Sequence, residues 1–137
     1  MGDLKTRKLK VITLDIGGTN RECQISNWQM NNNSEDGEKL YSYCPNGEDV
    51  EETDPDYSLD LTFYSDWTSG GISDWFVLHD GETVSFQLDH HPDIVGEHVR
   101  WVGELKVKAP NVGGEVRTTE TQEITVQCIG KPEYSRP

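Results

Sequence analysis

The last third of the chain alternates apolar and polar residues with a period of two. Between residues 98 and 108, every second position is apolar or small: Val99, Trp101, Gly103, Leu105 and Val107. Such a run is typical of a strand with one buried and one hydrated face. A second strand is expected over residues 121–129, ended by residues 130–132, whose Gly and Pro break regular pairing. The polar run of residues 115–119 is expected to form a short strand between them.

Four earlier segments carry strand patterns as well. Residues 8–14 and 21–28 flank a glycine-rich turn and together predict a β-hairpin. Residues 59–64 and 84–88 predict two further strands. The period changes to that of a helix over residues 69–80, where the apolar positions fall at i, i+3, i+4 and i+7: Ile72, Trp75, Phe76 and His79. Asp80 and Gly81 are expected to end this helix.

These patterns predict a mainly β fold, an antiparallel β-sandwich or half-barrel with one short α-helix and a long acidic loop. We expect a single domain over residues 1–137, with an N-terminal arm (1–8), the acidic loop (29–57) and a C-terminal tail (130–137). The residues expected in the core are Phe63, Trp75, Phe76, Phe86, Trp101, Leu105, Ile124 and Val126. The sequence leaves open whether Trp28 and Trp67 are buried or form an exposed aromatic platform.

The formal net charge of −13 excludes one class of function. Affinity for nucleic acid comes mostly from Lys and Arg that neutralise phosphates, so this chain should lie beside DNA without binding it. The chain contains no run of 18 apolar residues, so the sequence predicts no transmembrane helix. No apolar segment follows the basic residues near the N-terminus, and the three cysteines are an odd number. We therefore expect no signal peptide and reduced thiols in a cytoplasm.

The acidic loop permits two interpretations. It is either a solvated, partly disordered segment or a segment that becomes ordered against a partner. In the second case the contact residues would be Tyr41, Tyr43, Glu48, Asp49, Val50, Glu51 and Glu52, with the two tyrosines and the valine as anchors. Its expected electrostatic partner is the basic arm of another subunit, formed by Lys5, Arg7, Lys8 and Lys10.

Two motifs invite a chemical role. The sequence LDIGGTN at residues 14–20 resembles the first phosphate loop of sugar kinases related to actin and hexokinase. That family also needs a second phosphate segment and an adenosine segment, and the chain contains neither, so a glycine-rich hairpin turn is favoured. The histidines (His79, His90, His91 and His98) lack the spacing of a zinc site. No GxSxG motif is present either. We expect no cofactor, no metal and no enzymatic activity.

The order of elements from residue 58 to residue 132 resembles the major tail protein, the tail tube subunit of long-tailed, siphovirus-type bacteriophages. The resemblance lies in a strand, the short helix GGISDWFVLHDG, the strand ETVSFQLD, a strand opening with WVGEL, the turn APNVGGEV and a last strand that closes at GKP. It implies a structural virion protein in the phage tail, assembled in the host bacterial cytoplasm.

The resemblance also implies partners. Such subunits form hexameric rings that stack into a hollow tube, through which DNA passes to the host without specific binding. A tape-measure protein, a tail terminator and tail-tip proteins would contact the tube. The candidates for acidic residues that line the lumen are Glu104, Glu115 and Glu123, because each is polar within the terminal strands. The alternatives are an isolated β-sandwich binding or adhesion module and, more remotely, a nucleotide-binding fragment that uses the LDIGGTN turn.

Overall fold

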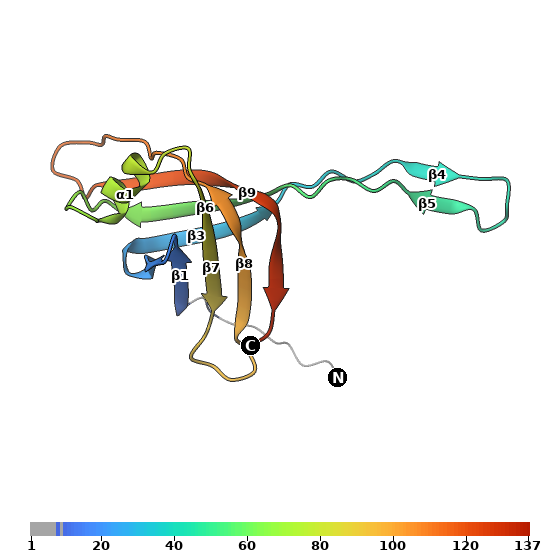
Figure 1. Ribbon diagram of the computed structural model, residues 1–137, viewed down its shortest axis with the longest axis horizontal. Coiled ribbons are helices and arrows are strands. Elements are labelled where there is room, and N and C mark those ends of the chain that lie inside the picture. The colour runs from blue at the N-terminus through green and yellow to red at the C-terminus, as the bar shows by residue number, and fades with distance from the viewer. Residues whose placement is uncertain (1–7, 9) are drawn as a thin grey trace.

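The computed structural model describes residue 8 and residues 10–137, which form a curled, mainly β body and a projecting hairpin (Figure 1). The strands are β1 (Ile12–Ile16), β2 (Thr19–Asn20), β3 (Ile25–Asn32), β4 (Lys39–Tyr41), β5 (Glu48–Val50), β6 (Tyr57–Tyr64), β7 (Thr83–His90), β8 (Val99–Lys106) and β9 (Thr121–Ser135). The one α-helix of the described residues is α1 (Ile72–Leu78), and a 3-10 turn, η1, spans Glu22–Gln24.

Seven strands form one continuous antiparallel sheet in the order β2-β1-β7-β8-β9-β6-β3. Strand β9 belongs to both layers of the body, because its first half pairs with β6 and its second half pairs with β8. In Figure 1, β3, β6 and the first half of β9 run across β1, β7 and β8. The prediction of a mainly β antiparallel fold with a half-barrel shape is therefore confirmed.

A bulge allows β9 to turn from one layer into the other. Glu104 of β8 pairs with Ile129, whereas Val102 pairs with Glu133, so three residues of β9 lie opposite Gly103 alone. Gly130 has a φ of 73°, which a glycine adopts without strain. The prediction that residues 130–132 end the strand, and that 130–137 is a tail, was wrong. A glycine in a bulge bends a strand without ending it.

The predicted hairpin of residues 8–28 was also wrong. Strand β1 pairs with β2 and β7, whereas β3 pairs with β6 at the opposite edge of the sheet. The chain reverses at the glycine turn, but β2 has only two residues before η1 redirects it to the other layer. The two edges still approach each other, because Lys10 and Ile12 share a cavity of about 140 Å³ with residues 25–28.

The predicted core is confirmed, with one refinement. Six of the eight expected residues are buried between the two layers: Phe63, Phe76, Phe86, Leu105, Ile124 and Val126. Trp75 and Trp101 are partly buried and pack against this core, as Trp28 does, while Trp67 is 44% exposed. Helix α1 was also predicted correctly, and Gly81 follows it with a positive φ of 86°. Through Ile72 and Phe76 the helix contributes to the core.

The expected strand at residues 115–119 does not form. These residues belong to an exposed connection between β8 and β9, in which the Thr118 amide donates to the Glu115 carbonyl across a turn. Arg117 has a φ of 63°, outside the range of a strand. A polar run with no apolar face gains nothing from pairing with the sheet, and it remains a turn.

Gly17→Ala is expected to destabilise the fold more than Gly18→Ala. Both glycines have positive φ, at 63° and 88°, so each substitution costs about 1–2 kcal/mol in the backbone. A Cβ at Gly17 would also lie 2.8 Å from the Trp75 ring, whereas a Cβ at Gly18 meets nothing within 4 Å. Thermal unfolding of both variants isolates the contact with Trp75, and equal losses would contradict it.

Candidate assembly site

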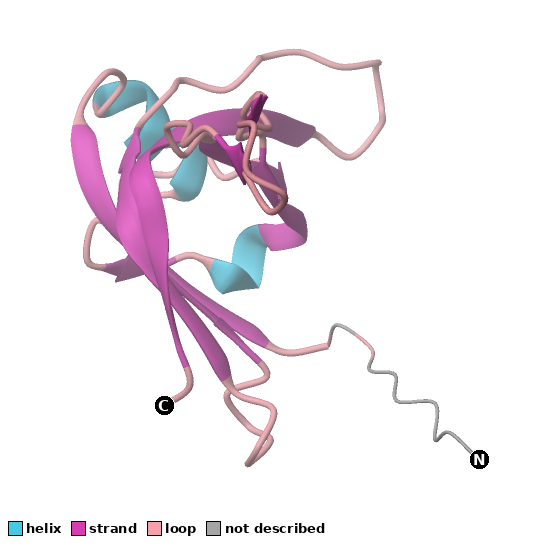
Figure 2. Ribbon diagram, turned by 90° about the vertical axis from the view of Figure 1, so that its right-hand side faces the viewer, coloured by secondary structure: helices cyan, strands magenta, loops and turns pink. Residues whose placement is uncertain are grey.

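Residues 33–56 form a hairpin arm that projects from the body (Figure 1). Strands β4 and β5 pair with each other, with Lys39 opposite Val50 and Tyr41 opposite Glu48. They form a sheet of their own, separate from that of the body. Figure 2 views the body from the side toward which the arm points. The arm carries nine Asp and Glu residues against one Lys, so it holds much of the negative charge of the chain.

The apolar side chains of the arm are exposed on both of its faces. Tyr41 and Val50 share one face with the Lys39–Glu48 ion pair, whose charged atoms lie 3.6 Å apart. Leu40 points to the other face. The exposed fractions are 72% for Tyr41, 49% for Val50 and 47% for Leu40, and Tyr43 near the tip is fully exposed. These side chains have apolar area to bury and no packing partner in the body.

The seven residues predicted to contact a partner all lie in this arm, but the prediction of one loop over residues 29–57 was wrong. Strand β3 continues to Asn32, β6 begins at Tyr57, and the arm contains two strands. The missed signal was Asn46–Gly47, a dipeptide typical of hairpin turns, between apolar residues on either side. Whether the segment contacts a partner stays a prediction.

A second surface is the polar face of β3, β6 and β9, called the amide face here. Its members are Asn27, Gln29, Asn31, Asp60, Thr62, Glu123 and Thr125. Asp60 lies at its centre and accepts hydrogen bonds from Asn31 Nδ2 at 2.7 Å and from Thr125 Oγ1 at 2.6 Å. Gln29 Nε2 donates to Asn31 Oδ1 at 2.7 Å. Part of this face lines a depression of about 450 Å³, bordered by Lys108 and Asn111. The network holds the polar side chains of this face in place.

The structure does not bring the three candidate lumen residues together. Glu123 lies on the amide face, next to Thr62 in the ladder. Glu104 lies on β8, opposite Ser85 and Ile129, in the other layer. Glu115 lies in the turn between β8 and β9, so the expectation that it alternates along a strand was wrong. All three are exposed. Which of them faces a lumen stays a prediction.

The basic arm is described only in part, because Lys5 and Arg7 lie outside the described residues. Lys8 and Lys10 are exposed and line a cavity of about 340 Å³ together with Val11, His91, Asp93, Ile94 and Glu97. The lining thus contains carboxylates as well as the two lysines. The expected pairing of this region with the acidic arm of another subunit stays a prediction.

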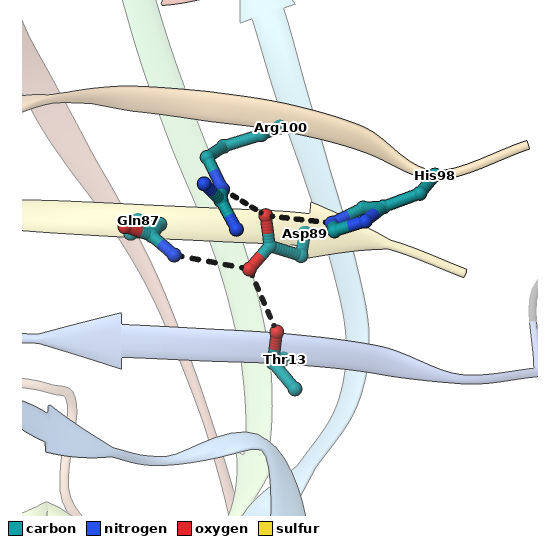
Figure 3. Close-up of polar contacts among 5 residues, drawn as sticks. All are labelled: Thr13, Gln87, Asp89, His98 and Arg100. Carbon is teal, nitrogen blue, oxygen red and sulfur yellow. Dashed lines mark hydrogen bonds and ion pairs between the residues drawn. The ribbon is translucent and has the colours of Figure 1, made fainter. Parts of the chain in front are cut away.

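A buried carboxylate that the sequence patterns did not predict lies on the layer formed by β1, β7 and β8 (Figure 3). The Asp89 side chain is 8% exposed. Its Oδ1 accepts a hydrogen bond from Arg100 Nε at 2.8 Å and lies 3.2 Å from His98 Nε2. Its Oδ2 accepts hydrogen bonds from Thr13 Oγ1 and Gln87 Nε2, both at 3.1 Å. The donors come from β1, β7, β8 and the residue before β8.

These contacts keep Asp89 ionised and link neighbouring strands. Burial raises the pKa of Asp89, but the hydrogen bonds from Arg100, Gln87, His98 and Thr13 outweigh it and hold the pKa below its ordinary value. The Thr13 hydroxyl donates to the carboxylate and not to an imidazole, so the cluster has no activated nucleophile. It therefore acts as an ion-pair network that ties three strands together.

The LDIGGTN segment forms the turn between β1 and β2. Gly18 N–H donates to Asp15 Oδ1 at 2.9 Å, and Gly17 N–H donates to the Ser85 carbonyl at 2.9 Å. A phosphate loop keeps such amides free for its ligand, so these contacts favour the hairpin-turn interpretation.

Among the residues that the structure describes, no group of three or more His, Cys, Asp and Glu side chains is placed to hold a metal. The described helix is also too short to cross a membrane.

No family model matches the chain, and no curated protein matches its sequence. The function must therefore be inferred from the arm, the amide face and the residues of the chain.

Proposed function

We propose that the protein is a structural subunit that assembles with copies of itself into hexameric rings, which stack into a hollow tube of the phage-tail type. The observation that carries this proposal is the hairpin arm. The arm is an acidic hairpin that extends into solvent, and a neighbouring subunit would bury its exposed Leu40, Tyr41 and Val50. The resemblance to tail tube subunits supplies the hexameric ring and the tube.

The body supports the same proposal. Apolar residues make up only 33% of the chain, which suits a subunit that buries further area between copies. Strand β3 forms one edge of the sheet. At the other edge, β2 pairs with only two residues of β1 and leaves the rest of that strand open. Open edges favour pairing with another chain, and a closed ring removes them. If the projecting arm binds a different surface of the next copy, the contact is head-to-tail, the kind that generates rings and filaments.

Assembly is tested by electron microscopy and sedimentation of the purified protein. We expect rings or tubes at high protein concentration or after addition of tail-tip components. A protein that remains monomeric at all concentrations and salts, with no tubes in infected cells, contradicts the proposal. That result would favour the isolated binding module.

The amide face is proposed to line the channel. A ring repeats each side chain around a narrow bore, where low-dielectric walls focus the field of Asp60 and Glu123. The other side chains of this face are neutral amides and hydroxyls, which hydrate well, and a cation, Lys108, lies only at the border of its depression. By contrast, Arg100 and Lys106 share the outer face of β8 with Glu104. A surface that DNA passes without binding should resemble the amide face.

Glu123→Lys and Glu104→Lys tubes are expected to differ in DNA retention. Lys at a lumen position releases counterions on contact with phosphates, so retention should be strong at low salt and fall steeply as salt rises. We expect this behaviour for Glu123→Lys alone, measured as DNA that cosediments with assembled tubes. Retention by Glu104→Lys alone would place the other layer at the lumen. If neither variant retains DNA while assembly is normal, both faces lie outside the channel.

A further inference from the structure

Arg21 is a buried cation that the body does not fully compensate. It is 9% exposed. Its Nη1 donates to the Gly70 carbonyl at 3.1 Å, and the guanidinium carbon lies 5.6 Å from the centroid of the Trp75 ring. Its Nε is buried without a hydrogen-bond partner. The guanidinium is thus held in place by a carbonyl and an aromatic ring, and this one hydrogen bond uses only part of its five N–H donors.

Asp66, whose charge acts on Arg21, does not form an ion pair with it. Asp66 Oδ1 accepts hydrogen bonds from the amide and the hydroxyl of Thr68, at 3.1 and 2.6 Å, and these bonds lower the pKa of Asp66. No carboxylate oxygen of the described residues lies within 4.0 Å of an Arg21 nitrogen. A buried charge that has no counter-charge in contact is costly. A ligand that supplied one would relieve this cost.

Arg21 lines a cavity of about 250 Å³ between η1 and the loop before α1. The lining consists of Asn20, Arg21, Cys23, Gln24, Asp66 and residues 68–72. Thr68 and Ser69 contribute hydroxyl groups, and Asn20 contributes a side-chain amide. Cavities for drug-sized ligands usually begin at about 300 Å³, so this one suits a single small group and is too small for a nucleotide.

We propose that this cavity binds one carboxylate group, with Arg21 as its cationic donor. A guanidinium matches the planar carboxylate in shape and charge. Asp66 lines the same cavity and disfavours a second negative charge, so dianionic phosphate should bind poorly. The carboxylate is either that of a free small molecule or an acidic side chain from the hairpin arm of a second copy. The site itself does not depend on the tube proposal.

Cys23 and Cys44 provide a matched test. Both thiols are exposed, but Cys23 lines the cavity and Cys44 lies at the tip of the arm. Alkylation of each thiol is followed by mass spectrometry in three titrations: with acetate, with phosphate at pH 8, and with a peptide of residues 33–56 in which Ser replaces Cys44. We expect acetate to slow alkylation of Cys23 in a saturable manner and to leave Cys44 unchanged. Protection by the peptide but not by acetate assigns the site to a second copy.

Two variants give opposite expectations. Arg21→Gln is expected to abolish the protection of Cys23. Asp66→Asn removes the repelling charge and is expected to tighten acetate binding by about tenfold at low salt. Tighter binding by Asp66→Asn cannot result from misfolding, so this variant still tests the proposal if Arg21→Gln unfolds. The proposal is overturned if neither acetate nor the peptide protects Cys23, if phosphate protects as well as acetate, or if Asp66→Asn leaves the affinity unchanged.

Discussion

A variant without the hairpin arm is expected to fold as a monomer and to form no rings or tubes. Asn32 and Tyr57 are paired at the base of the arm, so residues 33–56 can be replaced by a two-residue Asn-Gly turn without disturbing the ladder between β3 and β6. No residue of the arm belongs to the core. Circular dichroism and thermal unfolding should therefore match those of the full chain, while sedimentation should show monomer at every concentration.

Point variants separate the anchors from the arm as a whole. Tyr41→Ser combined with Val50→Ser removes two apolar side chains from one face of the arm and should weaken assembly at least tenfold in critical concentration, since each buried side chain of this size contributes about 1.5–3 kcal/mol. Leu78→Ser is the matched control, because Leu78 is 71% exposed on α1, outside the arm. If the protein without the arm still forms normal tubes, the arm is not needed for assembly.

Hydrogen exchange reports on the same arm without any mutation. The ladder between β4 and β5 is short and solvated, so its amides should exchange fast in the monomer. In assembled tubes a neighbouring subunit should cover them and slow the exchange. Equal rates in both states would contradict an ordering role for the arm.

The sequence predicted those elements whose own residues determine them. Alternation along residues 59–64, 84–88 and 99–107 identified β6, β7 and β8, because a strand with one buried face has an apolar residue at every second position. Helix α1 was found because its period differs from that of its neighbours. The core residues were predicted from the apolar faces of the same strands and helix. These predictions need no knowledge of which strand pairs with which.

Pairing and isolated polar contacts could not be predicted in the same way. Whether Gly130 ends β9 or bends it depends on Gly103 of another strand, which the local pattern does not contain. The separation of β1 from β3 depends on η1, a three-residue turn without a strong signal. Asp89 and Arg21 each look like ordinary surface charges, since their partners lie up to 76 residues away in the sequence. Only the fold brings these groups together.

Asp89→Ala is expected to destabilise the fold more than loss of an exposed carboxylate. It leaves Arg100, Gln87 and Thr13 without their shared acceptor, but Arg100 is 34% exposed and can be rehydrated, so we expect a loss of about 1.5–3 kcal/mol. For a domain of this size, that loss lowers the melting temperature by about 5–10 °C. Asp93→Ala, at an exposed position in the following loop, is the control and should change stability by less than about 0.5 kcal/mol.

The pH dependence of the same pair of proteins tests the cause of this effect. Asp89 has a pKa below its ordinary value in the folded protein, so its ionised form stabilises the fold at pH values above the ordinary pKa. That contribution is lost as the pH falls from near 4 through the lowered pKa, where the carboxylate becomes protonated. The difference in unfolding free energy between the native chain and Asp89→Ala should therefore be larger above pH 4 than below it, and should shrink as the pH falls through the lowered pKa of Asp89. A difference that stays constant down to pH 2 would mean that the loss comes from packing alone and that the ion-pair network of Figure 3 contributes nothing through its charge.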